Sequence, residues 1–178
     1  MTQDKPTEKQ EDVITAINVA MMLISNETSL DSIRHNNFFD RINIISPKQE
    51  GRPEITTLTK TGILTITGSR DINSNEWNTV SVVLKEKSWD MLGTKTCNFL
   101  TSLNLRFLGS KKEVKHITSI NVNKELTYYA FHYQWGSNDD IDVVFRAESD
   151  EKYNVNNCPQ NFHSVVVSKK TYSARDKL

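Results

Sequence analysis

The feature that most constrains how this chain folds is its pair of cysteines, Cys97 and Cys158, the only thiols among 178 residues. If they are bonded, the protein matures in an oxidising compartment, because the thiols of cytosolic proteins are kept reduced. A bond that closes a loop of about 60 residues would stabilise the fold by roughly 4 kcal/mol on the chain-entropy model. The alternative is two unpaired, buried thiols that pack as small apolar side chains. Spacing alone leaves both readings open.

Length and composition predict one domain over residues 1–178. The chain is 37% hydrophobic, which suits one ordinary core and is short for two. It carries 22 basic and 22 acidic side chains, so its formal net charge is zero and nucleic acid is not an expected partner. The longest apolar run, Val13–Ile24, is shorter than the roughly 20 apolar residues that cross a bilayer. Residues 1–12 show no signal-peptide core, so we expect either a cytosolic chain or one whose export segment was removed.

The N-terminal part predicts an amphipathic helix over residues 7–25. Thr7 and Gln10 have the spacing of a capping box. Apolar side chains then recur at helical spacing, and we expect them to pack on a sheet: Val13, Ile17, Met21 and Ile24. Residues 1–6 are expected to be disordered or foreign to the native chain, and a short second helical turn is expected over residues 29–36.

The rest of the chain predicts mainly strands, at residues 63–67, 77–84, 105–108, 116–122, 127–134, 141–145 and 162–168. A second amphipathic helix, from Ser88 to Leu103, carries Cys97. Loops are predicted at residues 47–53, 71–75, 109–115, 136–140 and 154–160. This order of elements predicts an α+β fold with an antiparallel sheet.

No sequence motif predicts catalysis, and no metal or cofactor is expected. The four histidines lie far apart and have no partner at metal-ligand spacing. A Cys–His nucleophile pair would have to form in space, since Cys97 carries no local signature. The acidic residues near Asp140 lack the pattern of a calcium loop and fit a solvated turn. Lys111, Lys112 and Lys115 form a small basic patch that could meet anionic groups, but a solvated loop is the default for such a run.

Four stretches, taken in order, resemble the globular part of a type IV pilin, particularly the type IVb pilins and their minor-pilin relatives. The first is the amphipathic helix with the passage Phe38–Pro47, and the second is the glycine-bearing strand Thr61–Ile66. The third is Val80–Leu84 followed by the helix with Cys97, and the last is Asn156–Val167. Each stretch is weak by itself, and their order carries the resemblance.

The resemblance implies a Cys97–Cys158 disulfide that staples the second helix to the sheet. It also implies that an apolar helix preceded Thr7, anchoring the subunit in the inner membrane before assembly into an extracellular fibre. The expected partners are other pilin subunits, with a tip adhesin or a host surface as further candidates. The role is assembly and display, and a minor pilin that starts or caps the fibre is favoured. The candidate subunit contacts lie in two predicted loops: Lys111, Lys112, Asp139 and Asp140.

Two other classes of protein remain open from the residues. One is a cytosolic binding protein, such as an immunity-type inhibitor, whose cysteines stay reduced. The other is a pseudopilin of a type II secretion system, which would share the fold and the membrane stem. Pairing of the two cysteines separates the exported classes from the cytosolic one.

Overall fold

The computed structural model describes residues 8–35, 37–45, 54–59, 64–70, 76–84, 103–136, 138–148 and 162–170. Helices α1 (Glu8–Ile24) and α2 (Leu30–Arg34) come first in the chain. The strands are β1 (Phe39–Ile45), β2 (Glu54–Thr59), β3 (Leu64–Arg70), β4 (Trp77–Leu84), β5 (Leu105–Ser119), β6 (Val122–Trp135), β7 (Asn138–Glu148) and β8 (Phe162–Lys169). The predicted class, α+β with an antiparallel sheet, is confirmed, and the sheet dominates the described part of the chain.

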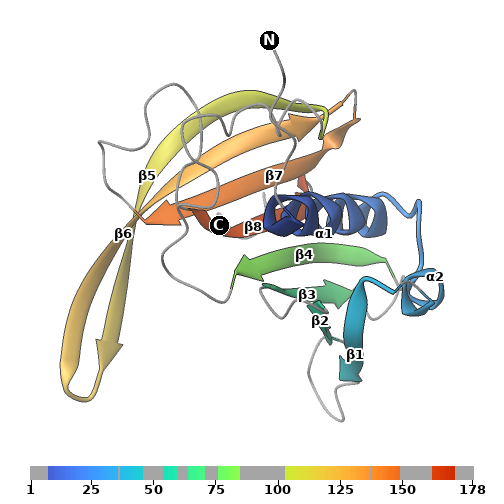
Figure 1. The fold of residues 1–178 in the computed structure, drawn as a ribbon. Helices are drawn as coiled ribbons and strands as arrows, with labels where there is room; N and C mark the ends of the chain where they lie inside the picture. The colour runs from blue at the N-terminus through green and yellow to red at the C-terminus, as the bar shows by residue number, and fades with distance from the viewer. Residues whose placement is uncertain are drawn as a thin grey trace.

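The strands form one eight-stranded antiparallel sheet in the order β1-β2-β3-β4-β8-β7-β6-β5. The last strand, β8, lies between β4 and β7 and joins two meanders, β1–β4 and β5–β7, into a single sheet (Figure 1). Val165 and Val167 of β8 are completely buried, and Ser164 and Ser168 on its other side are nearly so. This central strand is therefore fully buried on its core side, and the two serines on the other side are nearly buried.

Helix α1 contacts β3, β4 and β8, and Figure 1 shows it lying along the middle of the sheet. The four apolar residues singled out from helical spacing are all at most 1% exposed: Val13, Ile17, Met21 and Ile24. Ala16, Val19, Ala20 and Leu23 are buried as well. The buried surface of α1 is thus wider than the single stripe that the sequence pattern indicated.

The two predicted N-terminal helices are confirmed. Helix α1 begins one residue later and ends one residue earlier than the expected range, 7–25. Helix α2 is capped by Ser29, whose hydroxyl accepts a hydrogen bond from the backbone N–H of Ser32 at 3.3 Å. This capping satisfies a donor that the first helical turn leaves unpaired.

The predicted strands are confirmed best in the centre of the sheet. Strand β4 matches the expected 77–84, and β8 extends the expected 162–168 by one residue. Strands β3, β6 and β7 are longer than predicted, whereas β1 and β2 were not predicted as strands at all. Strands β1 and β2 lie at one edge of the sheet, where β1 pairs with β2 and β2 pairs with β3. Their extended conformation therefore depends on these partners more than on their own residues.

The predicted loop at residues 109–115 is wrong, because strand β5 runs through it. Phe107 pairs with Tyr133 and Gly109 with His132, so Leu108 is an extra residue and the glycine belongs to a bulge. The strand expected at 116–122 is confirmed only up to Ser119, where β5 ends, because the chain reverses between Ser119 and Val122.

Other predictions lie outside the described residues or are corrected by β7. Asp139 and Asp140 lie inside β7, not in a turn. The helix expected from Ser88 to Leu103 lies outside the described residues apart from its final Leu103, which is in a turn, and so do Cys97 and Cys158. The loops expected at 47–53, 71–75 and 154–160 and the leader 1–6 also lie outside them. Within the described part of the chain, no helix has both the length and the apolarity needed to cross a membrane.

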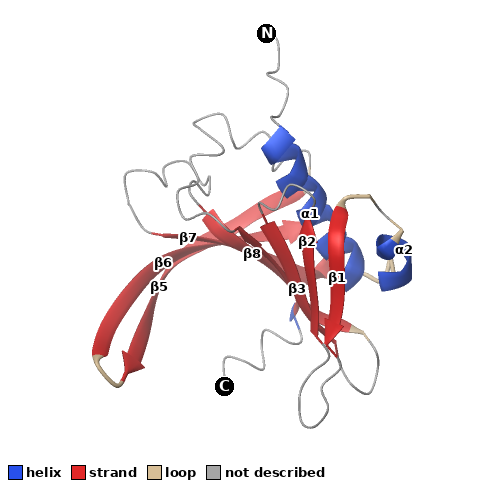
Figure 2. Ribbon diagram, turned by 60° about the horizontal axis from the view of Figure 1, so that its bottom comes forward, coloured by secondary structure: helices blue, strands red, loops and turns tan. Residues whose placement is uncertain are grey.

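Strands β5 and β6 continue far beyond the sheet as a projecting hairpin. Strand β6 pairs with β7 only over residues 128–135, whereas its pairing with β5 continues to Ser119 and Val122. Residues 114–127 therefore form a two-stranded ribbon, which we call the arm. Figures 1 and 2 show the arm extending away from the body of the sheet, at the end opposite to β1.

Candidate functional site

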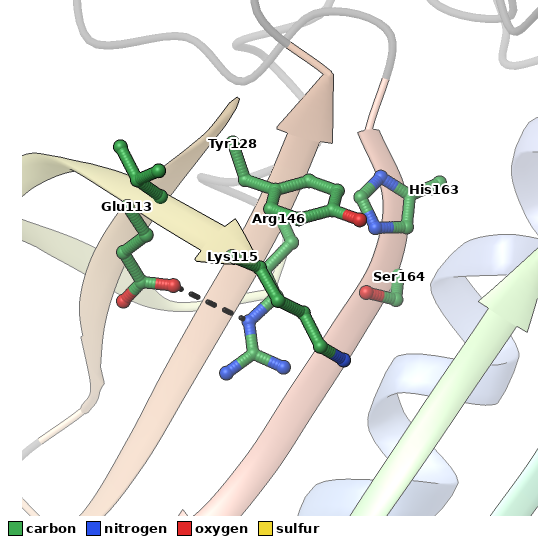
Figure 3. A pocket seen from close by; sticks show the side chains of 7 residues that line it. Glu113, Lys115, Tyr128, Arg146, His163 and Ser164 are labelled. Carbon is green, nitrogen blue, oxygen red and sulfur yellow. Dashed lines mark ion pairs between the residues drawn. The ribbon is translucent and has the colours of Figure 1, made fainter. Parts of the chain in front are cut away.

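A hollow of about 550 Å³ lies at the base of the arm. Four adjacent strands, β5 to β8, supply its lining, which Figure 3 shows from close by. The lining residues combine charged, aromatic and hydroxyl side chains with one aliphatic side chain: Glu113, Val114, Lys115, Tyr128, Arg146, His163 and Ser164. A volume of this size is in the range of small-molecule sites.

The hollow lies on the face of the sheet that is turned away from the main core. In β7 the odd-numbered residues 141–147 are buried in that core, so Arg146 points to the other face. Arg146 stands opposite Ser164 of β8, and Tyr128 stands opposite Glu113 of β5. Strand register therefore places residues that are far apart in sequence on one patch of surface.

The charges of the hollow are partly balanced. Nε of Arg146 lies 3.9 Å from a carboxylate oxygen of Glu113, and the two side chains are 45% and 43% exposed. That separation is too long for a hydrogen bond and makes a weak, solvent-screened ion pair. Figure 3 shows the charged ends of Arg146 and Lys115 extending towards the same end of the hollow. With two cations and one carboxylate, the lining has an excess of positive charge, leaving His163 aside.

An aromatic pair forms the other end of the hollow. The rings of Tyr128 and His163 lie 5.4 Å apart with an angle of 46° between their planes. His163 is the extra residue of a bulge in β8, because Arg146 pairs with Ser164 while Ala147 pairs with Phe162. The bulge turns the imidazole towards Tyr128, and the hydroxyl of Ser164 lies beside them (Figure 3).

The arm offers a second candidate surface. Its residues from 114 to 125 are all exposed, and they include four large apolar side chains: Val114, 47% exposed, Ile117, 39%, Ile120, 100%, and Val122, 51%. Across the two strands, His116 faces Glu125 at 3.9 Å and Thr118 donates a 3.4 Å hydrogen bond to Asn123. Exposed contacts of this kind stabilise a hairpin very little.

The structure does not bring the sequence-predicted contact residues together. Lys111 and Lys112 lie in β5 next to the base of the arm, and both are exposed. Asp139 and Asp140 lie in β7, where Asp140 is six residues from Arg146, or about 20 Å along an extended strand. The four α1 residues belong to the core, and Cys97 and Cys158 lie outside the described part of the chain.

Sequence reasoning missed the hollow as a site, although it singled out Lys115 as part of a basic patch. Glu113, Tyr128, Arg146 and Ser164 attract no attention as a motif, because only the strand register makes them neighbours. The one signal in the sequence was the alternation of apolar and polar residues along β7, which places Arg146 on the face away from the core. Among the described residues, no three His, Cys, Asp or Glu side chains are grouped so that they could hold a metal ion.

Compared with known proteins, the chain matches no family model, no curated protein and no solved structure. The resemblance to type IV pilins therefore stays a prediction.

Proposed function

We propose that this chain is a non-catalytic structural subunit of a bacterial type IV pilus, a minor pilin that starts or caps the fibre. On this proposal it occupies the inner membrane and periplasm first and the extracellular fibre afterwards. Its partners are other pilin subunits. The pilus itself is proposed from the sequence resemblance, and the capacity for assembly is supported by the arm.

The arm is the observation that carries the proposal. A two-stranded hairpin without further partners is at best marginally stable in water. This one exposes Ile120 completely at its tip, with Ile117 and Val122 close by in sequence and also exposed. Clustered exposed apolar side chains mark protein contact sites more often than free surface. A neighbouring subunit that covered the tip would remove these side chains from water and hold the hairpin in place.

The position of α1 supports the same reading. A pilin-like arrangement needs an N-terminal helix that packs along the sheet and continues towards a membrane stem. Here α1 contacts the central strands β4 and β8, and its Ile17 and Met21 are fully buried. We extend the proposal to a second helix that Cys97–Cys158 staples to the sheet, as the resemblance implies.

Fibre formation tests the role of the arm in the cells that encode this chain. Ile120→Asp places a charge on the exposed tip, and Asn121→Asp is the matched control, because it adds the same charge at the next turn residue, which is also exposed. We expect Ile120→Asp to reduce the fibres recovered by shearing and seen by electron microscopy, while Asn121→Asp keeps them. Both purified variants should melt at the wild-type temperature, because neither side chain is buried.

Two results would contradict the proposal. Cells that lack the gene but carry fibres in normal number and length would show that the chain is no pilus subunit. Normal fibres with Ile120→Asp would show that the tip of the arm takes no part in assembly.

A thiol count separates export from a cytosolic role. Labelling of the unfolded, unreduced protein should find no free thiol if Cys97 and Cys158 are paired. Two reactive thiols in carefully non-reduced material would favour the cytosolic binding protein.

A further inference from the structure

We propose that the hollow at the base of the arm binds a small acidic ligand, a hydroxylated ring that carries a carboxylate or a phosphate group. In the proposed pose the anionic group lies between Arg146 and Lys115. The ring packs against Tyr128, and its hydroxyl groups meet Ser164 and His163. This site is separate from the tip of the arm and does not depend on the proposed assembly role.

The cations favour an anionic group at one end of the hollow. The contact of Arg146 with Glu113 runs through Nε, and Arg146 has no second ion pair with any described residue. Its two Nη groups carry four of the five guanidinium N–H donors, a geometry that matches carboxylate and phosphate oxygens. Lys115, exposed on β5, adds a second cation to the same end (Figure 3). An anion there would make charge-assisted hydrogen bonds, which are stronger than neutral ones.

The other end of the hollow favours a ring with hydroxyl groups. The tilted rings of Tyr128 and His163 present flat apolar surface beside polar edges. The hydroxyl of Ser164 both donates and accepts, and so does the phenol of Tyr128. Strands β6 and β8 are fixed in the sheet by β7 between them, so this wall is held in place before a ligand arrives.

Glu113 gives the site a property that substitutions can test. Its carboxylate competes with an incoming anion for Arg146, so its removal should strengthen anion binding, whereas removal of a cation should weaken it. Opposite effects of two neighbouring substitutions are not expected from a general loss of structure. The side chains of Glu113 and Arg146 are both nearly half exposed, so substitution of either one should not disrupt the fold.

Three related sugars test the chemistry on the ¹⁵N-labelled full chain. Glucuronate carries a carboxylate, glucose 6-phosphate carries a phosphate, and glucose is the neutral control. We expect at least one acidic sugar to shift the amide signals of the hollow saturably, with a dissociation constant of about 1 mM, and glucose to leave them unchanged. The stronger of the two acidic probes identifies the anionic group that the site prefers.

Variants then assign the binding to the named residues. Arg146→Gln and Lys115→Gln should each weaken binding of the acidic probe, the former by about tenfold. Glu113→Gln should tighten it. Lys124→Gln is the matched control, because Lys124 is an exposed lysine of the same arm that does not line the hollow, and it should change binding by less than about twofold.

Each of three results would overturn the inference. The first is that neither acidic sugar shifts the amides of the hollow. The second is that glucose binds as well as the acidic sugars. The third is that Lys124→Gln weakens binding as much as Lys115→Gln, which would indicate diffuse attraction to a basic surface.

Discussion

Replacement of Met21 by alanine tests how α1 is held against the sheet. Met21 is fully buried, whereas Met22, the next residue of the same helix, is 37% exposed. Met21→Ala removes the three non-hydrogen atoms Cγ, Sδ and Cε from the core. At about 0.8 kcal/mol for each buried methylene-sized group, their burial contributes about 2.4 kcal/mol. The cavity left behind raises the expected loss of stability to about 3 kcal/mol.

Met22→Ala is the control, because it makes the same chemical change in the same helical turn. Its side chain already contacts solvent, and alanine has the higher helix propensity. We therefore expect a loss below about 1 kcal/mol. The difference between the two variants, about 2 kcal/mol or more, reports the burial of Met21 alone.

Urea unfolding followed by circular dichroism measures both losses, with the slope against urea concentration expected to stay unchanged. For a chain of this size, about 3 kcal/mol corresponds to a melting temperature lower by roughly 6–12 °C. Equal losses for the two variants would refute the reasoning, since they would mean that α1 does not pack through the side that carries Met21.

Two further predictions concern β6 and the turn after it. Burial raises the pKa of the Tyr133 phenol above its ordinary value of about 10. The phenol of the unfolded chain therefore ionises first, and the contribution of Tyr133 to the free energy of unfolding is complete below about pH 10 and is lost above it. Urea unfolding at alkaline pH should show stability falling by up to about 1.4 kcal/mol more per pH unit in wild type than in Tyr133→Phe; equal slopes would contradict this. Gly136→Ala should cost about 1–2 kcal/mol, because Gly136 has a φ of 54° and an added Cβ would lie 2.9 Å from Nδ2 of Asn104. An unchanged melting temperature of Gly136→Ala would oppose that account.

The elements that sequence reasoning predicted well are those whose own residues decide them. Helix α1 has a capping signal and apolar residues at helical spacing, and its predicted ends are within one residue of the observed ones. Strands β4 and β8 are rich in valine and lie in the centre of the sheet. Local propensity and burial favour the same structure there, so no information about distant partners was needed.

The arm shows where local reasoning fails. Gly109 followed by Lys111 and Lys112 has the composition of a loop, yet these residues form a strand. Pairing with β6 decides their conformation, and the glycine serves a bulge instead of a turn. The weak strand signal between Gly109 and Lys115 could not predict the partner, because a partner on another strand is not a property of the local sequence.

The sequence by itself determined the class of fold, the N-terminal helix and the apolar side chains through which that helix is buried. Hydrophobic periodicity and capping act over a few neighbouring residues, so no distant partner is needed to see them. Only the tertiary structure decided the sheet order, which places β8 in the centre, and the face on which Arg146, Tyr128 and Ser164 meet. The same is true of the arm, whose exposure follows from where the pairing of β6 with β7 stops. Strand register joins residues across tens of positions, and the hollow exists because of that register.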